Sequence, residues 1–301
     1  MMYKIISLIA CSSLLFFSVS CTDIEEPVSV ETVAEMTTVP QEINISAPHA
    51  GLYNAETVKC LYSKASDERI YPASLTKIVT ACTALKYVSA DSVFKVGTEL
   101  HLVPEGSSIC LIQQGHRLKL RDLLTGMLMC SGNDAAYTVA VNIAKVVSGN
   151  RNMTDSQSVE YFCFLMNNLA TDIGAKDSNF TNPDGWDSEM QYSTVHDLAL
   201  ISSYAMQIEE IRNIVSMQKK YVVFESGENI TWNNTNKLLV PESDFYLSQA
   251  IGLKTGTTEK AGNCLIAVLN VNNKEYIIVI TGCDSDNSRY ETVQQLIKLI
   301  N

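Results

Sequence analysis

The spacing of apolar residues separates segments of strand character from segments of helix character along this chain. Two short alternating runs, 50–53 and 58–62, predict a β-hairpin. From Ser74 onward, apolar residues recur every three or four positions, which is typical of amphipathic helices. The predicted helices are 74–85, 121–129, 134–147, 159–173, 194–207 and 290–300.

Strand periodicity returns before the last of these helices. Runs 264–271 and 275–281 are separated by Asn272 and Asn273, two residues that tolerate positive φ, so a tight hairpin is expected. Strands thus occur near both ends of the folded part, with helices between them. This order predicts an α/β (α+β) fold, in which one antiparallel sheet built from both chain ends is flanked by helices and an all-helical region is inserted.

The N-terminus has the features of an export signal. Lys4 precedes residues 5–20, which are mostly apolar and uncharged but shorter than the roughly 20 residues that span a bilayer. We therefore expect residues 1–20 to be a signal peptide. Small residues before Cys21 resemble a bacterial lipoprotein cleavage site, although Ser18 stands where a larger aliphatic residue is usual. Lipidation of Cys21 is predicted, with ordinary signal cleavage as the alternative.

Charge and composition divide the rest of the chain. Residues 22–48 contain six acidic residues, no basic and no aromatic residue, so the stretch 21–48 is predicted to be a disordered tether ahead of a folded part at 49–301. The net charge of -11 disfavours nucleic acid as a partner, because both are acidic. It also gives no attraction to an anionic membrane, so attachment would depend on an N-terminal lipid rather than a transmembrane helix.

The cysteines and histidines do not form a metal-binding pattern. The nine cysteines lie at least ten residues apart, and the four histidines are not paired in the sequence. Most cysteines have apolar neighbours, which is typical of buried thiols. We predict no metal and no cofactor.

The first chemical motif is Ser74-Leu75-Thr76-Lys77 at the start of a predicted helix. Residues three apart are neighbours on a helix, so the amine of Lys77 can reach the hydroxyl of Ser74. A serine becomes a good nucleophile when an adjacent base takes its proton. Lysine can be that base only if burial or a second cation lowers its pKa from about 10.4. Alone, the motif is common in ordinary helices.

The second motif is Ser131-Gly132-Asn133, between two predicted helices. In the structural interpretation it is a turn in which Asn133 caps the following helix. In the functional interpretation Ser131 relays a proton and the amide of Asn133 orients a substrate backbone.

The third motif is Lys254-Thr255-Gly256-Thr257, just before the terminal hairpin. Glycine in a strand often marks a close approach of another backbone, so a peptide substrate is able to lie along this strand edge. Lys254 is a candidate for the second cation that lowers the pKa of Lys77, and for a group that holds a substrate carboxylate.

Together and in this order, the three motifs resemble the penicillin-binding protein and serine β-lactamase superfamily. Longer matching segments make the chain similar to the low-molecular-mass penicillin-binding proteins that are D-alanyl-D-alanine carboxypeptidases, peptidase family S11. The resemblance covers about residues 48–301. The segments that carry it include Tyr71–Lys77, Ser131–Ala136, Asn182-Pro183-Asp184-Gly185, Tyr192-Ser193-Thr194 with Asp197, Trp232–Leu239 and Gly252–Gly256.

The resemblance implies a β-lactamase/transpeptidase-like fold and removal of the terminal D-alanine from the D-Ala-D-Ala end of peptidoglycan stem peptides. Ser74 would form the acyl-enzyme, with β-lactams as covalent inhibitors, and Lys77 would be its general base. Ser131 and Lys254 would carry the proton to the leaving amine, and Asn133 would bind the substrate amide. Thr255, Gly256 and Thr257 would bind the substrate, with the two threonines at its carboxylate and the backbone N–H groups of Ser74 and Thr257 at the oxyanion.

Some features of the chain depart from the pattern of the family. The C-terminal β-rich domain and membrane helix of many relatives are not expected here, so an N-terminal lipid would hold the exported enzyme at the outer face of the cell membrane. Trp186 stands where relatives often have leucine, and Arg289 is either the family arginine or part of a surface salt bridge.

A class A β-lactamase is disfavoured by Gly132 and by the lack of Glu-x-x-Leu-Asn between Ser131 and Lys254. Endopeptidase and transpeptidase activities remain open, whereas a silent wall-binding lipoprotein would not need these motifs.

Overall fold

A computed structural model describes residues 43–300 of the chain. The predicted signal peptide, Cys21 and the predicted tether as far as residue 42 lie outside the described residues. The packed body begins earlier than residue 49, because Ile45 and Ala47 are buried and Lys64 Nζ donates to the backbone oxygen of Ile45. The packed part therefore includes residues ahead of the boundary predicted at residue 48, at least from Ile45 onward. Within the described part, no helix is both long and apolar enough to cross a bilayer.

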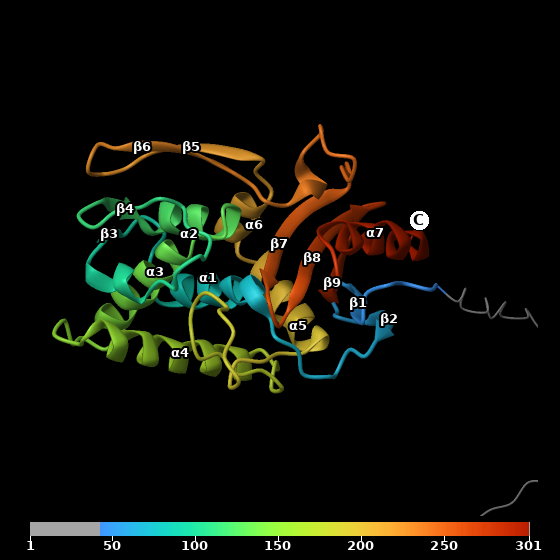
Figure 1. Ribbon diagram of the computed structural model, residues 1–301, viewed down its shortest axis with the longest axis horizontal. Helices are drawn as coiled ribbons and strands as arrows, with labels where there is room; N and C mark the ends of the chain where they lie inside the picture. Colours follow the sequence, from blue (N-terminus) through green and yellow to red (C-terminus); the bar gives the residue numbers. More distant parts are fainter. Residues whose placement is uncertain (1–42, 301) are drawn as a thin grey trace, which may run out of the picture. The chain divides into compact units, whose positions relative to one another are not determined.

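The central sheet has five antiparallel strands in the order β2-β1-β9-β8-β7, so both ends of the chain contribute to it, as predicted (Figure 1). Asn272 and Asn273 turn the chain between β8 and β9 with positive φ, which confirms the predicted hairpin. Strand β7 forms one edge of the sheet. The strands are β1 (His49–Asn54), β2 (Cys60–Lys64), β7 (Ala250–Thr258), β8 (Gly262–Val271) and β9 (Lys274–Cys283).

The predicted helices are all present, with shifted ends. Helices α4 and α7 begin four residues before the predicted starts at 159 and 290, because Thr154 and Ser285 form capping boxes that the apolar pattern does not reveal. A short 3₁₀-helix, Ala73–Leu75, leads directly into α1. The helices are α1 (Thr76–Tyr87), α2 (Leu120–Met129), α3 (Asn133–Val147), α4 (Asp155–Asp172), α5 (Val195–Met206), α6 (Glu209–Val215) and α7 (Asp286–Leu296).

Several short elements were not predicted. The strands of two small hairpins have at most five residues each, and helix α6 has seven, too few for a clear period. The hairpins pair β3 (Val93–Lys95) with β4 (Arg117–Lys119), and β5 (Lys219–Val223) with β6 (Asn229–Asn233). The remaining short helices that were not predicted are Thr98–Leu102 and Lys237–Leu239, whereas Ile297–Leu299 follows α7 within the predicted helix 290–300.

The two faces of the sheet are covered by different helices, because alternate side chains of a strand point to opposite faces. On β8, Leu265 and Leu269 pack with Tyr290 of α7, whereas Ile266 and Val268 pack into the larger core with α1. Helix α1 contacts α2, α3, α4 and α5, and so joins the sheet to the inserted helices (Figure 1). The α+β fold with an inserted helical region is confirmed. It places the start of α1, and with it Ser74, beside the edge strand β7.

Candidate active site

Ser74 and Lys77 meet at the start of α1, as the first motif predicts. Lys77 Nζ lies 2.8 Å from Ser74 Oγ and donates a second hydrogen bond, of 2.7 Å, to the backbone oxygen of Asp184. The side chain of Lys77 is fully buried, whereas Ser74 is partly exposed. The Ser74 hydroxyl therefore contacts a buried amine, while the residue is still partly accessible to solvent.

Burial lowers the pKa of Lys77 to about 8, and the nearby carboxylates of Asp184 and Asp134 partly oppose this decrease. An amine with that pKa is partly neutral at physiological pH, so it is able to accept the proton of Ser74. Lys254 was expected to lower the pKa of Lys77, but it is not among the causes of the decrease. The charge of Lys77 acts instead on Lys254, whose pKa is lowered well below the usual value by burial first and by Lys77 and Arg289 next.

The second motif lies in the turn between α2 and α3. Ser131 has a φ of 60°, in the left-handed region that costs a non-glycine residue about 1–2 kcal/mol. Hydrogen bonds from Gly132 N to Gly126 O and from Asn133 N to Ser108 O hold this turn. Strain held in this way is common at functional sites. Ser131 is buried in this turn, and its role as a proton relay stays a prediction.

Asn133 does not cap α3, contrary to the structural interpretation of the motif. The N-cap residue is Gly132, without a side-chain cap, and Asn133 is the first residue of the helix. Its side-chain Nδ2 instead donates a hydrogen bond of 2.6 Å to Asp184 Oδ2. The second motif is thereby tied to the same residue that holds Lys77.

The third motif lies on β7, close to Ser74. A Cβ atom added to Gly256 would lie 3.2 Å from Ser74 N, so the strand and the 3₁₀-helix pack closely here and a side chain at this position would push them slightly apart. Lys254 is buried, and its amine donates to the backbone oxygen of Thr255. Thr255 Oγ1 lies 2.7 Å from Thr235 Oγ1, while Thr257 at the end of the motif is exposed.

Arg289 lies behind β7 and is buried, so it is not part of a purely surface salt bridge. Its Nη1 donates to the backbone oxygens of Gly256 and Cys264 and lies 3.4 Å from Thr257 Oγ1. Asp286 pairs with the guanidinium, whose Nε has no partner among the described residues. A positive charge therefore stands directly behind the exposed hydroxyl of Thr257.

The loop 182–187 rests on α1, and its Asp187 accepts a hydrogen bond from Thr258 at the end of β7. Thr80 Oγ1 donates to Pro183 O, and Asn182 Oδ1 accepts from Gly185 N, which fixes the path of the loop. Gly185 has a φ of 88°, and a Cβ atom there would lie 1.8 Å from Ala73 O. Trp186 is exposed at the rim. Asp184 is the site residue that the sequence analysis missed: its segment was recognised, but no role was given to it.

Replacing Gly185 with alanine should lower the free energy of unfolding by about 2–5 kcal/mol. The positive φ accounts for about 1–2 kcal/mol, and the overlap with the Ala73 backbone adds about 1–3 kcal/mol. Urea denaturation of both proteins measures the difference. Gly174→Ala is the matched control, because Gly174 also has a positive φ but open space around it. Equal losses in the two variants would show that the contact with Ala73 is unimportant.

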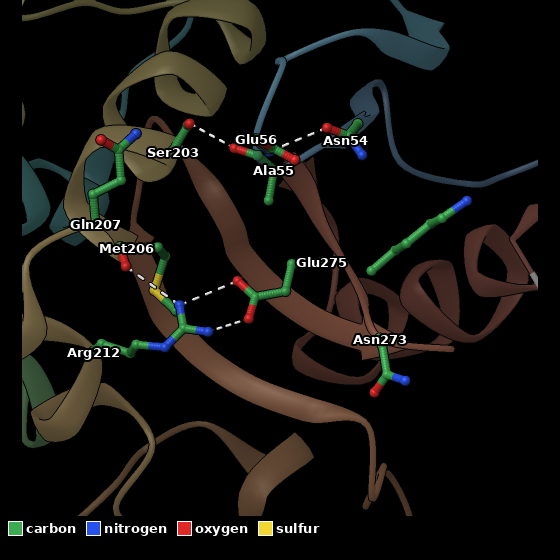
Figure 2. A pocket seen from close by; sticks show the side chains of 10 residues that line it. Asn54, Ala55, Glu56, Ser203, Met206, Gln207, Arg212, Asn273 and Glu275 are labelled. Atoms are coloured by element: carbon green, nitrogen blue, oxygen red, sulfur yellow. Dashed lines mark hydrogen bonds and ion pairs between the residues drawn. The ribbon is translucent and has the colours of Figure 1, made fainter.

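A separate cavity of about 510 Å³ lies at the other end of the sheet (Figure 2). It adjoins Asn54 at the end of β1, whereas the third motif ends beside Asn263 and Cys283, at the opposite ends of β8 and β9. Figure 2 shows the guanidinium of Arg212 facing the carboxylate of Glu275, so these two of the four charged residues that line the cavity form an ion pair. None of the predicted site residues lines it.

The chain was compared with protein families and with individual relatives. The family model of D-alanyl-D-alanine carboxypeptidase, peptidase S11, matches residues 35–285. D-alanyl-D-alanine carboxypeptidase DacF of Bacillus subtilis is 30% identical over 85% of this chain and 62% of its own length. DacD of Escherichia coli is 31% identical over 86% of this chain and 64% of its own length. The chain thus spans less than two thirds of these two relatives.

Another relative and a solved structure are matched over most of their length. The D-alanyl-D-alanine carboxypeptidase of Streptomyces sp. K15 is 32% identical over 78% of this chain and 80% of its own length. The crystal structure of the Streptomyces K15 DD-transpeptidase superposes with a TM-score of 0.76 at 29% identity, covering 85% of this chain and 97% of that one. By sequence and by fold, this chain belongs to the D-alanyl-D-alanine carboxypeptidase family of serine peptidases, S11.

Proposed function

We propose that the protein is a serine-type D-Ala-D-Ala carboxypeptidase, which removes the terminal D-alanine from peptidoglycan stem peptides. The observation that carries this proposal is the buried Lys77 amine, 2.8 Å from Ser74 Oγ and with its pKa lowered to about 8. A hydroxyl with a partly neutral amine beside it is an activated nucleophile. Membership of the carboxypeptidase family supports the same reaction.

The reaction proceeds through an acyl-enzyme. Neutral Lys77 takes the proton of Ser74 while Oγ attacks the carbonyl carbon of the penultimate D-alanine. The backbone N–H groups of Ser74 and Thr257 stabilise the oxyanion, a device worth roughly 3 kcal/mol per donor. Ser131 and Lys254 pass a proton to the leaving amine, free D-alanine departs, and water then hydrolyses the ester on Ser74.

The substrate lies along β7. This strand pairs only with β8 among the described strands, so its outer edge accepts a peptide in an extended conformation. Asn133 then faces the substrate backbone from the opposite side. At the end of the strand, Thr255 and Thr257 bind the C-terminal carboxylate, and the charge of Arg289 behind Thr257 favours an anion there. A carboxylate site beside the nucleophile favours an exopeptidase.

Transpeptidation is the second candidate, because a solved relative is named a DD-transpeptidase. The two reactions share the acyl-enzyme and differ only in whether water or an amine accepts the acyl group. A class A β-lactamase is disfavoured by Gly132 in the second motif and by the absence of Glu-x-x-Leu-Asn between residues 131 and 254.

The test is to incubate the purified protein with a pentapeptide that ends in D-Ala-D-Ala and to assay free D-alanine, with and without an added acceptor amine. A carboxypeptidase releases D-alanine in water alone, whereas a transpeptidase needs the amine and forms a new peptide bond with it. A wall-binding protein without activity would release none, and that result would overturn the proposal.

We further propose that the enzyme is exported and held at the outer face of the cell membrane by a lipid on Cys21. The uncharged apolar stretch 5–20 and the small residues before Cys21 support this, and so does the location of peptidoglycan outside the membrane. A single acyl chain binds a membrane only marginally, whereas two or more anchor stably, and bacterial lipoproteins carry at least two.

Cys21→Ala should release the protein from the membrane. Cells expressing the wild type and the variant are fractionated, and the protein is followed by immunoblotting in the detergent, soluble and medium fractions. The wild type should partition into detergent and the variant into a soluble fraction or the medium. If both proteins are soluble, or both stay bound, Cys21 is not the anchor.

A further inference from the structure

Asp184 joins two of the motifs through different atoms. Its backbone oxygen accepts the hydrogen bond from Lys77 Nζ, and its carboxylate Oδ2 accepts the 2.6 Å bond from Asn133 Nδ2. The other carboxylate oxygen, Oδ1, accepts from Trp186 N at 3.3 Å. The residue is 1% exposed. One buried residue thus contacts both the expected base and the expected substrate-binding amide.

The contacts of Asp184 favour its ionised form. Both carboxylate oxygens face N–H donors, and among the described residues neither has an acceptor for a carboxyl proton. Burial raises the pKa of Asp184, while the positive charge of Lys77 and nearby backbone N–H groups oppose that increase. The carboxylate therefore supplies a negative charge beside a buried cation.

Other groups around Lys77 do not supply the same contact. The carboxylate of Asp134 is bound by the backbone N–H groups of Cys110, Ile112 and Ala135, so it fastens the loop before β4 to α3. Tyr137 and Cys163, which also face Asp184, have raised pKa values because of burial and stay neutral. The remaining ionisable group, Lys254, is an amine and supplies no negative charge.

We propose that Asp184 is a positioning residue for acylation, which orients the Asn133 amide with its carboxylate and holds the Lys77 amine with its backbone oxygen. This inference rests on the proposed acyl transfer at Ser74. A carboxylate only accepts hydrogen bonds, so the NH₂ group of Asn133 must face it. The amide oxygen of Asn133 and its second N–H hydrogen are then left to bind a substrate backbone.

Asp184→Asn removes the charge but preserves the shape and the backbone contact. Lys77 then loses a neighbouring negative charge that raises its pKa, so the acid limb of the acylation rate should move to lower pH. The maximal rate should fall by about 10- to 100-fold, because an amide at 184 no longer dictates which end of Asn133 faces it. A residue with a purely structural role would change stability without moving the acid limb.

The measurement is the rate of acylation by a fluorescent penicillin from about pH 5 to about pH 10, in the wild type and in three variants. Asp184→Glu keeps the charge and should keep the acid limb near its wild-type position while slowing the reaction. Asp197→Asn is the matched control, because Asp197 is also a buried carboxylate with two donors but lies in α5, away from Lys77. Circular dichroism checks the fold of each variant.

A double-mutant cycle tests whether Asp184 acts through Asn133. Asn133→Ala and the double variant with Asp184→Asn should have similar maximal rates, since the carboxylate has nothing to orient once the amide is absent. Losses that multiply would overturn the inference, as would an unshifted or upward-shifted acid limb in Asp184→Asn, or an equal shift in Asp197→Asn. If Asp184→Asn does not fold, a wild-type rate of acylation in Asp184→Glu overturns the inference.

The proposed function fails in a different way. If penicillin does not acylate the wild-type protein, the proposed acyl transfer at Ser74 is wrong, whatever the variants show.

Discussion

Ser74→Ala should abolish the covalent adduct that penicillin forms with the wild-type protein. The hydroxyl of Ser74 is the atom that attacks the β-lactam carbonyl, and loss of a serine nucleophile costs a factor of about 10⁶ in turnover in a serine peptidase. Intact-mass analysis after penicillin treatment should show one stable adduct on the wild type and none on the variant. Release of D-alanine from the pentapeptide should fall below detection in the same variant.

Ser89→Ala is the control for this substitution. Ser89 is exposed just beyond the C-terminal end of α1 and contacts only a neighbouring backbone N–H group. It should be labelled like the wild type. An adduct that persists on Ser74→Ala would place the nucleophile elsewhere, and rapid turnover of penicillin by the wild type without an accumulating adduct would favour a β-lactamase.

Lys77→Ala should slow acylation by about 10²- to 10⁴-fold, the usual contribution of a general base. Alanine is a good helix residue, so the first turn of α1 should persist. The substitution does remove a cation beside the buried carboxylate of Asp184, so a lower melting temperature is also expected. Stopped-flow fluorescence with a labelled penicillin measures the rate, at a temperature at which circular dichroism shows the variant folded.

The pH dependence identifies the base independently. Protonation removes the lone pair of Lys77, so the wild-type rate should fall as the pH decreases below about 8 and level off above it. Lys86→Ala, on the same helix but exposed and paired with Asp172, should retain both the rate and this profile. A near wild-type rate in Lys77→Ala would assign the base to another group.

The local features of the fold and site could be predicted from the sequence. The helical spacing of Ser74 and Lys77 predicts their contact, since it depends only on residues three apart on one helix. The asparagine pair between β8 and β9 predicts its turn because few residues adopt positive φ. The arrangement of strands at both ends also follows from periodicity alone. The proximity of the three motifs followed only from the family resemblance, because no local pattern determines it.

The contacts that complete the site could not be predicted, because they join residues far apart in the chain. Asn133 and Asp184 are 51 positions apart, and Lys77 is 107 positions from the backbone oxygen that it binds. The burial of Arg289 depends on how α7 packs against β7 and β8, which the charge of the residue does not reveal. For Lys77, the sequence offered burial or a second cation as the cause of a lowered pKa, and only the folded structure shows that burial is the cause.

The bond from Lys77 to the main chain at position 184 has a consequence for how the site can change. Every residue has a backbone oxygen, so substitutions at position 184 keep this anchor, the acceptor that binds Lys77. They change the charge and the hydrogen bonds of the Asp184 side chain. The anchor instead depends on the course of the loop, which Asn182 and Gly185 determine. Position 184 is therefore a place where mutation changes the acid–base properties of the enzyme and the orientation of Asn133 while the Lys77 amine keeps its anchor, whereas Asn182 and Gly185 leave little freedom for redesign.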